Sequence, residues 1–137
     1  MKNTEEEKLT SLVRESFRES GAFHPCAVFD EPLDCIRVFT RDCSFTEIRI
    51  DDRITVLEDN YCASGAEKYV GFTIKGARHF CNEHHFRLSA PVKMADLLNA
   101  ILEATPDPVV RVVVNGIVRP LVDKEQINEI ELVPQAA

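Results

Sequence analysis

Apolar residues recur along the chain with two different periods, and the longer period predicts two helices. Over residues 4–20 they lie three or four positions apart, and Gly21 follows as a stop signal. Over residues 90–104 the same spacing gives the strongest apolar stripe in the chain, and Ser89 precedes it as a candidate cap. Each pattern predicts a helix that buries one face.

Between residues 34 and 75 the apolar period becomes two, which is typical of half-buried strands. Apolar and polar residues alternate at 36–38, 47–50, 53–56 and 70–74. The connections between these segments are too short for crossover helices. We therefore expect an antiparallel β-meander over 34–75.

Residues 108–133 predict further strands. Val109–Val114 is almost continuously β-branched, and Asn115-Gly116 after it is the pair that favours a type I′ turn. We expect a β-hairpin around this pair and a last strand near Ile130.

Strands that come in runs, rather than in alternation with helices, are typical of α+β proteins. The predicted architecture is an antiparallel β-meander plus a C-terminal β-hairpin, packed against two helices. A length of 137 residues suits one core, so we expect a single α+β domain over 1–137.

Three strand segments carry a resemblance to a known family. They are Asp34–Phe39, Ile54–Asp59 and Tyr69–Ile74, the last with a Val-Gly pair. Through these segments residues 34–80 resemble the YuzE-like family of small bacterial domains of unknown function. The resemblance implies a β-meander and no known activity.

Composition and charge narrow the function classes. With 16 Lys and Arg against 23 Asp and Glu the net charge is −7, so no nucleic-acid binding is expected, because it requires clustered cations. No apolar run approaches the ~20 residues of a membrane helix, and the acidic segment 1–7 lacks the pattern of a signal peptide. Five cysteines without a CxxC pair indicate reduced thiols. We therefore expect a cytoplasmic protein without membrane contact.

Four potential metal ligands lie close together in the sequence. They are His79, Cys81, His84 and His85. Zinc prefers imidazole and thiolate ligands, and His24 and Cys26 offer two more. A zinc-dependent enzyme built on these residues is weighed against the simpler interpretation that they are packed or solvated side chains, since their spacing matches no standard zinc signature.

A cysteine nucleophile is a second catalytic hypothesis for the same residues. Such a thiol needs a neighbouring histidine and a lowered pKa, and Cys81 near His79 or Cys26 near His24 meets the first condition. The chain has no GxGxxG, GxSxG or HExxH signature. An enzyme is therefore the alternative and not the leading hypothesis.

The same region is basic within an acidic chain. Four cations surround the cluster and are opposed only by Glu83, namely Lys75, Arg78, Arg87 and Lys93. Such a patch suits a small anionic ligand or an acidic partner. The alternative is a solvated surface whose charges are balanced from elsewhere in the fold.

The leading hypothesis is a non-catalytic module that assembles or binds a partner or a small ligand. Because both faces of Val109–Val114 are apolar, a strand at this position needs cover on both faces. One face would pack on the helix over 90–104 and the other on a second copy, so we expect a homodimer.

Overall fold

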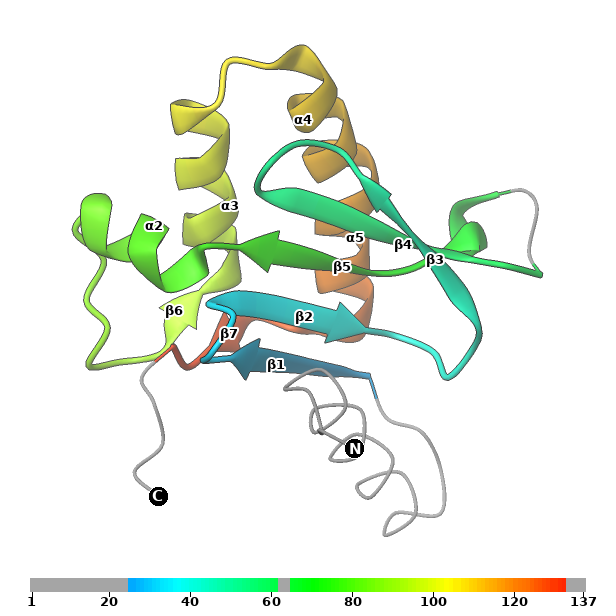
Figure 1. Cartoon of the computed structure of the whole chain (residues 1–137), viewed down its shortest axis with the longest axis horizontal. Helices are drawn as coiled ribbons and strands as arrows, with labels where there is room; N and C mark the ends of the chain where they lie inside the picture. The colour runs from blue at the N-terminus through cyan, green and yellow to red at the C-terminus, as the bar shows by residue number, and fades with distance from the viewer. Residues whose placement is uncertain (1–24, 62–64, 133–137) are drawn as a thin grey trace, which may run out of the picture.

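The computed structural model describes residues 25–61 and 65–132, which form a layer of strands and a layer of helices. In chain order the elements are β1 (Cys26–Asp30), β2 (Cys35–Phe39), β3 (Phe45–Arg49), β4 (Ile54–Asp59), the 3₁₀ turn η1 (Ala66–Lys68), β5 (Tyr69–Lys75), α2 (Ala77–Glu83), β6 (Val92–Lys93), α3 (Met94–Ala104), α4 (Pro108–Val113), the π-helical turn η2 (Val114–Val118), α5 (Arg119–Glu125) and β7 (Glu129–Ile130). Figure 1 shows α3 and the continuous rod α4–η2–α5 behind the sheet, crossing its strands. The helix expected over 4–20 lies outside the described residues.

Five antiparallel strands form the main sheet in the order β1-β2-β5-β4-β3. The predicted α+β class with an antiparallel sheet is confirmed. The expected meander holds for β3, β4 and β5, but β2 pairs with β5 instead of β3, with Val38 opposite Phe72. Strand β5 is central because every residue from Val70 to Ile74 is buried, so both of its faces are covered.

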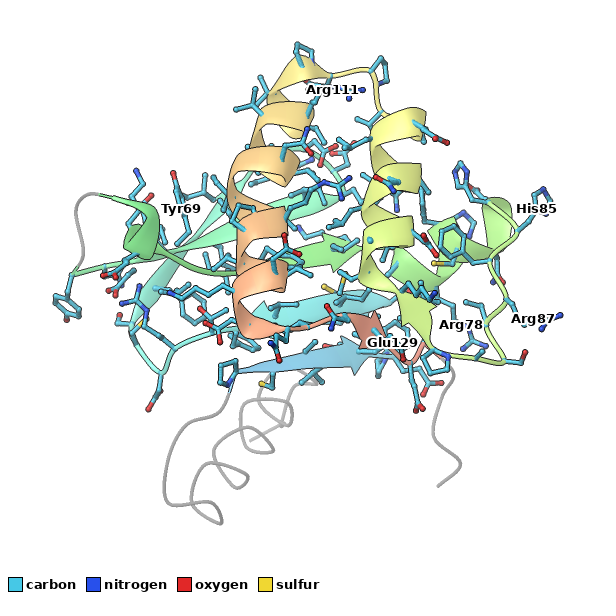
Figure 2. The ribbon with its side chains drawn as sticks, turned by 180° about the vertical axis from the view of Figure 1, so that it is seen from behind. Tyr69, Arg78, His85, Arg87, Arg111 and Glu129 are labelled. Carbon is cyan, nitrogen blue, oxygen red and sulfur yellow. The ribbon has the colours of Figure 1, made fainter. Side chains whose placement is uncertain are left out.

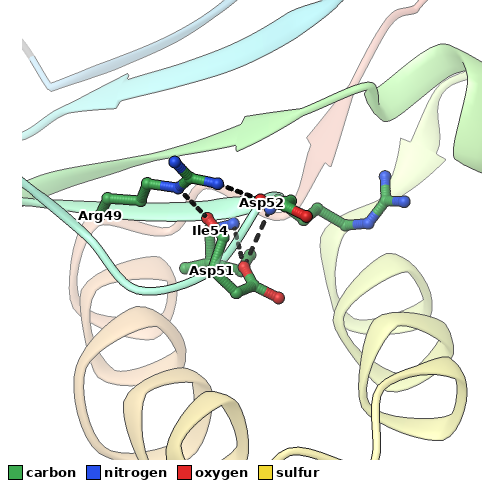
Figure 3. A network of polar contacts seen from close by, with 5 residues as sticks. Arg49, Asp51, Asp52 and Ile54 are labelled. Carbon is green, nitrogen blue, oxygen red and sulfur yellow. Dashed lines mark hydrogen bonds and ion pairs between the residues drawn. The ribbon is translucent and has the colours of Figure 1, made fainter.

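The turn between β3 and β4 contains Asp51 and Asp52 and no glycine. The Asp51 carboxylate accepts hydrogen bonds from the backbone N–H groups of Arg53 at 2.9 Å and Ile54 at 2.6 Å. The guanidinium of Arg49 pairs with Asp52 across the same turn (Figure 3). The aspartate side chain therefore adds to the backbone hydrogen bond from the Ile50 N–H to the carbonyl of Ile54 at 2.9 Å in holding the turn.

Helix α3 confirms the predicted second helix but begins at Met94 and not at residue 90. Val92 and Lys93 form β6, which pairs with β7, and the Met94 N–H donates to the carbonyl of Asn128 at 2.8 Å. Because strand pairing uses the backbone before Met94, Ser89 does not cap the helix. The last predicted strand is confirmed as β7.

The predicted hairpin around Asn115-Gly116 is wrong, because 108–125 is one helical rod. Pro108 occupies the first turn, and the Asp107 carboxylate caps it by accepting from the Val109 N–H at 2.9 Å. The buried residues of the rod follow a helical period, and they are Val110, Val113, Val114, Val118, Leu121 and Val122. Burial of this stripe against the sheet outweighs the strand propensity of the valines.

One hydrophobic core joins the sheet to both helices. On the sheet side, the core is formed by one face of the three inner strands β2, β4 and β5. The side chains on this face are Ile36, Val38, Ile54, Val56, Phe72 and Ile74. Leu97, Leu98 and Ile101 of α3 meet this face, and the π-helical turn η2 packs against β5. The core therefore fixes the rod across the sheet and brings η2 close to the start of β5.

Candidate functional site

A groove of about 290 Å³ lies between the helical rod and the end of the sheet where β2 stops and β5 starts. Its sheet side consists of Thr40, Arg41, Glu67 and Tyr69, and its helix side of Gly116, Ile117, Pro120, Leu121, Lys124 and Glu125. Figure 2 shows Tyr69 next to η1, at this end of the molecule. An apolar floor with a few polar groups at its rim is typical of sites for small ligands.

The π-helical turn η2 forms the helix wall of the groove. In a regular α-helix, at about 100° per residue, position 117 would lie about 20° from Val110 and position 118 about 80° away. The structure shows the reverse order of burial, because Val118 is fully buried and Ile117 is only half-buried. The extra residue in a π turn rotates the following residues, so that Val118 enters the core and Ile117 is released to line the groove.

Pro120 gives a physical reason for the π turn. Proline has no backbone N–H, and in a helix interior its ring clashes with the carbonyl four residues earlier, here that of Gly116. Widening the turn relieves this clash, and the Arg119 N–H bonds to the carbonyl of Val114 in the π pattern. Gly116 and Pro120 both line the groove, so the widened turn forms part of its helix wall.

The sheet wall is held by polar contacts at the ends of β2 and β5. The backbone N–H and the hydroxyl of Thr40 both donate to the carbonyl of Val70 at 2.9 Å. Arg41 donates to the carbonyl of Glu67 and lies 3.7 Å from the Asp59 carboxylate. These contacts fix the Arg41 guanidinium at the rim of the groove.

Three of the predicted metal ligands point to different surroundings in and after α2. Cys81 is fully buried in the core. His79 is exposed, with its Nε2 2.8 Å from a carboxylate oxygen of Glu83 one turn later. The ring of His84 packs on Phe80 with 4.1 Å between ring centres.

The remaining predicted ligands are also not gathered. His85 is exposed in the left-handed conformation that ends α2, with a φ of 61°. Cys26 is on the edge strand β1, and His24 lies outside the described residues. Within 25–61 and 65–132, no group of three or more His, Cys, Asp or Glu side chains is placed to hold a metal ion.

The two cysteines proposed as nucleophiles do not have the lowered pKa that this role needs. Burial raises the pKa of Cys81 from its ordinary 9.0 to about 11, and the negative charge of Asp34 adds to the effect. Burial also raises the pKa of Cys26. Both thiols are therefore protonated near neutral pH in the fold described.

The predicted basic patch is spread over several elements. Lys75 ends β5, Arg78 is in the first turn of α2, Arg87 follows that helix and Lys93 ends β6. Figure 2 shows Arg78 and Arg87 at the end of the molecule opposite Tyr69. None of the four lines the groove.

The sheet face that points away from the helices carries a second polar group of residues. Arg37 on β2 reaches Asp30 at 3.7 Å and, on the far edge strand, Glu47 at 4.0 Å. The Asp30 Oδ2, Arg37 Nε and Thr55 Oγ1 atoms are buried there and have no hydrogen-bond partner among residues 25–61 and 65–132. Their burial leaves no accessible surface on these atoms for a ligand, so this group is a packing feature of the sheet.

Comparisons with protein families, with curated proteins and with solved structures gave no match. The resemblance of residues 34–80 to the YuzE-like family therefore stays a prediction. No helix within the described ranges is both long and apolar enough to cross a membrane. The fold and the groove together define an α+β protein with a small open pocket at one end of its sheet.

Sequence reasoning missed every residue of this groove. Its two walls are far apart in the chain, and Tyr69 is nearly 50 positions before Ile117. One signal was present in the sequence, because Gly116 and Pro120 interrupt a stripe that otherwise has a helical period. A helical stripe that shifts by one position next to a glycine and a proline is the pattern that a π turn produces.

Proposed function

We propose that this protein is a non-catalytic module that binds a small ligand in the groove between η2–α5 and the start of β5. The observation that carries the proposal is the π turn, because it turns Ile117 out of the core stripe and into the groove. π turns occur frequently at functional sites, and they cost stability that a purely structural helix need not lose.

The lining supports binding of a small molecule. Tyr69, Ile117, Pro120 and Leu121 form an apolar surface, and the charged groups around it are arginine, lysine and glutamate side chains. Among the described residues no cysteine or histidine lines the groove, so the thiol hypothesis finds no support at this site.

The alternatives remain as separate hypotheses. A metal- or thiol-dependent enzyme loses support, because the described members of the 79–85 cluster are not gathered. An anion binder using Lys75, Arg78, Arg87 and Lys93 stays a prediction. The homodimer also stays a prediction. The argument from a strand with two apolar faces no longer applies, because Val109–Val114 is helical and buries one face.

The homodimer hypothesis now depends on the exposed residues of α4. Val109 and Val112 are 55% and 70% exposed, which is high for valine. Sedimentation velocity at micromolar concentration tests the homodimer directly: a single monomeric species would contradict it.

The binding proposal is tested with a pair of variants on the same helical rod. Ile117→Trp fills the groove, whereas Val112→Trp places the same side chain on an exposed position outside the groove lining. A library of small fragments is screened by ligand-detected NMR against the natural protein and both variants. We expect fragments that bind the natural protein and Val112→Trp but not Ile117→Trp.

Two outcomes would contradict the proposal. One is that no fragment binds the natural protein at millimolar concentration. The other is that the fragments bind Ile117→Trp as well as they bind Val112→Trp. Circular dichroism of both variants checks that each has kept the fold.

A further inference from the structure

The rim of the groove carries balanced charge on each of its two walls. Arg41 and Glu67 belong to the sheet wall, and Lys124 and Glu125 to the helix wall. The four side chains sum to zero charge, so a ligand with a single charge would be attracted by one residue of each wall and repelled by its neighbour. A ligand that carries both signs can pair with both.

The two cations differ in how far they are already neutralised. Arg41 lies 3.7 Å from the Asp59 carboxylate, whereas Lys124 makes no ion pair with any described residue. Lys124 is therefore the stronger candidate to receive an anionic group. Glu67 and Glu125 make no ion pair within the described ranges either, so carboxylates are available for a cationic group.

The floor and the size of the groove limit the rest of the ligand. Tyr69, Ile117 and Leu121 offer an apolar surface to a side chain. Sites for drug-sized molecules run from roughly 300 to 1,000 Å³, so a groove of about 290 Å³ suits a smaller molecule. A nucleotide or a folded peptide would not be enclosed.

We propose that the groove binds a small zwitterion with an apolar side chain, of the class of a free amino acid or a dipeptide. The ligand carboxylate pairs with Lys124 and Arg41. The ligand ammonium pairs with Glu125 or Glu67, and the apolar side chain packs on Tyr69 and Ile117. This inference rests on the proposed function and names the ligand class of the same site.

The test compares ligands that differ in one charged end. Leucine and leucyl-leucine are titrated into ¹⁵N-labelled protein alongside leucinamide, which lacks the carboxylate, and N-acetyl-leucine, which lacks the ammonium. We expect the two zwitterions to shift amide signals of η2 and of the start of β5, with affinity at least tenfold above that of both blocked forms.

A charge-neutral variant identifies the residue that receives the carboxylate. Lys124→Gln should weaken leucine about tenfold and leave leucinamide nearly unchanged, because only leucine carries the carboxylate. Arg111→Gln is the matched control: it removes one positive charge from an exposed position of the same helical rod outside the groove lining and should change neither affinity.

The outcomes separate this inference from the proposed function. If the blocked forms bind as tightly as leucine, or if fragments bind the groove while no zwitterion does, the ligand class is wrong and the binding module stands. If neither zwitterions nor fragments bind, both proposals fail. If Lys124→Gln weakens leucine and leucinamide equally, the carboxylate assignment is overturned.

Discussion

Two glycines with opposite surroundings allow the packing of the central strands to be tested. A methyl group at Gly71, in β5, would place its carbon 2.1 Å from the carbonyl oxygen of Val38 on β2 and 3.0 Å from Cδ1 of Leu57 on β4. Carbon–oxygen contacts between strands are normally about 3.3–3.6 Å. The Gly71→Ala variant therefore requires β2 and β5 to separate by more than about 1 Å. At Gly116 an added methyl would meet no atom within 4 Å.

The expected magnitudes follow from these distances. Overpacking a core typically costs about 1–3 kcal/mol, and the Val38 carbonyl is backbone that cannot rotate away, so Gly71→Ala should lower the free energy of unfolding by about 3 kcal/mol. With an m-value of about 1.5 kcal/mol/M, the urea midpoint falls by about 2 M. Gly116→Ala should raise the free energy of unfolding by about 0.5 kcal/mol, because alanine restricts the unfolded chain.

Urea unfolding followed by circular dichroism measures both variants under one condition. The reasoning is refuted if Gly71→Ala unfolds within 0.3 M of Gly116→Ala, an order-of-magnitude threshold set by the usual error of such midpoints. That result would mean that β2 and β5 do not approach each other as closely as the fold requires. A urea midpoint for Gly116→Ala below that of the natural protein would mean that the added methyl group meets other atoms, although the structure has open space at this position.

Three further predictions concern other parts of the fold. Thr55→Val should raise the free energy of unfolding by about 1 kcal/mol, because the buried Oγ1 has no hydrogen-bond partner; a loss of stability in urea would show that the hydroxyl has one. The Asp34 carboxylate accepts hydrogen bonds from the backbone N–H groups of Arg78 at 2.6 Å and His79 at 3.1 Å, and Asp34 has a φ of 49°. Asp34→Ala should therefore lower the free energy of unfolding by about 2 kcal/mol, and Asp34→Asn should lower it clearly less. The folded-state pKa of Cys81 is raised to about 11 from 9.0, so its contribution to stability is complete below pH 9 and is lost as the pH rises toward 11. Unfolding measured from pH 8 to 10.5 should therefore lose less free energy in Cys81→Ala than in the natural protein, and equal losses would contradict the burial of this thiol.

The strands of the sheet were predictable because their evidence is local. Ile36 and Val38, like Ile54 and Val56, alternate with polar residues in the sequence, and these four side chains all enter the core. The order of the strands was not predictable in the same way. The pairing of β2 with β5 depends on residues more than 30 positions apart, such as Val38 and Phe72, and no local pattern specifies it.

The helical rod shows how two correct local rules gave a wrong prediction. Consecutive valines favour a strand, and Asn115-Gly116 favours a hairpin turn. The competing signal was the period of the apolar residues, which from Val110 to Val122 follows a helix. Burial of a full stripe on the sheet exceeds the propensity difference, which is well under about 1 kcal/mol per residue.

The location of the rule-breaking residues gives the strongest argument that the groove is more than a packing defect. A proline in a helix interior costs about 3 kcal/mol, and a glycine there costs about 1 kcal/mol relative to alanine. In a regular α-helical rod Pro120 and Gly116 would both incur this cost; the π turn relieves the Pro120 clash, and both residues line the groove. A helix whose only role was to cover the sheet would be better served by alanine at both positions, with Ile117 in the core stripe. Residues that weaken a scaffold are expected where a site needs them, so their convergence on one wall of the groove supports ligand binding there.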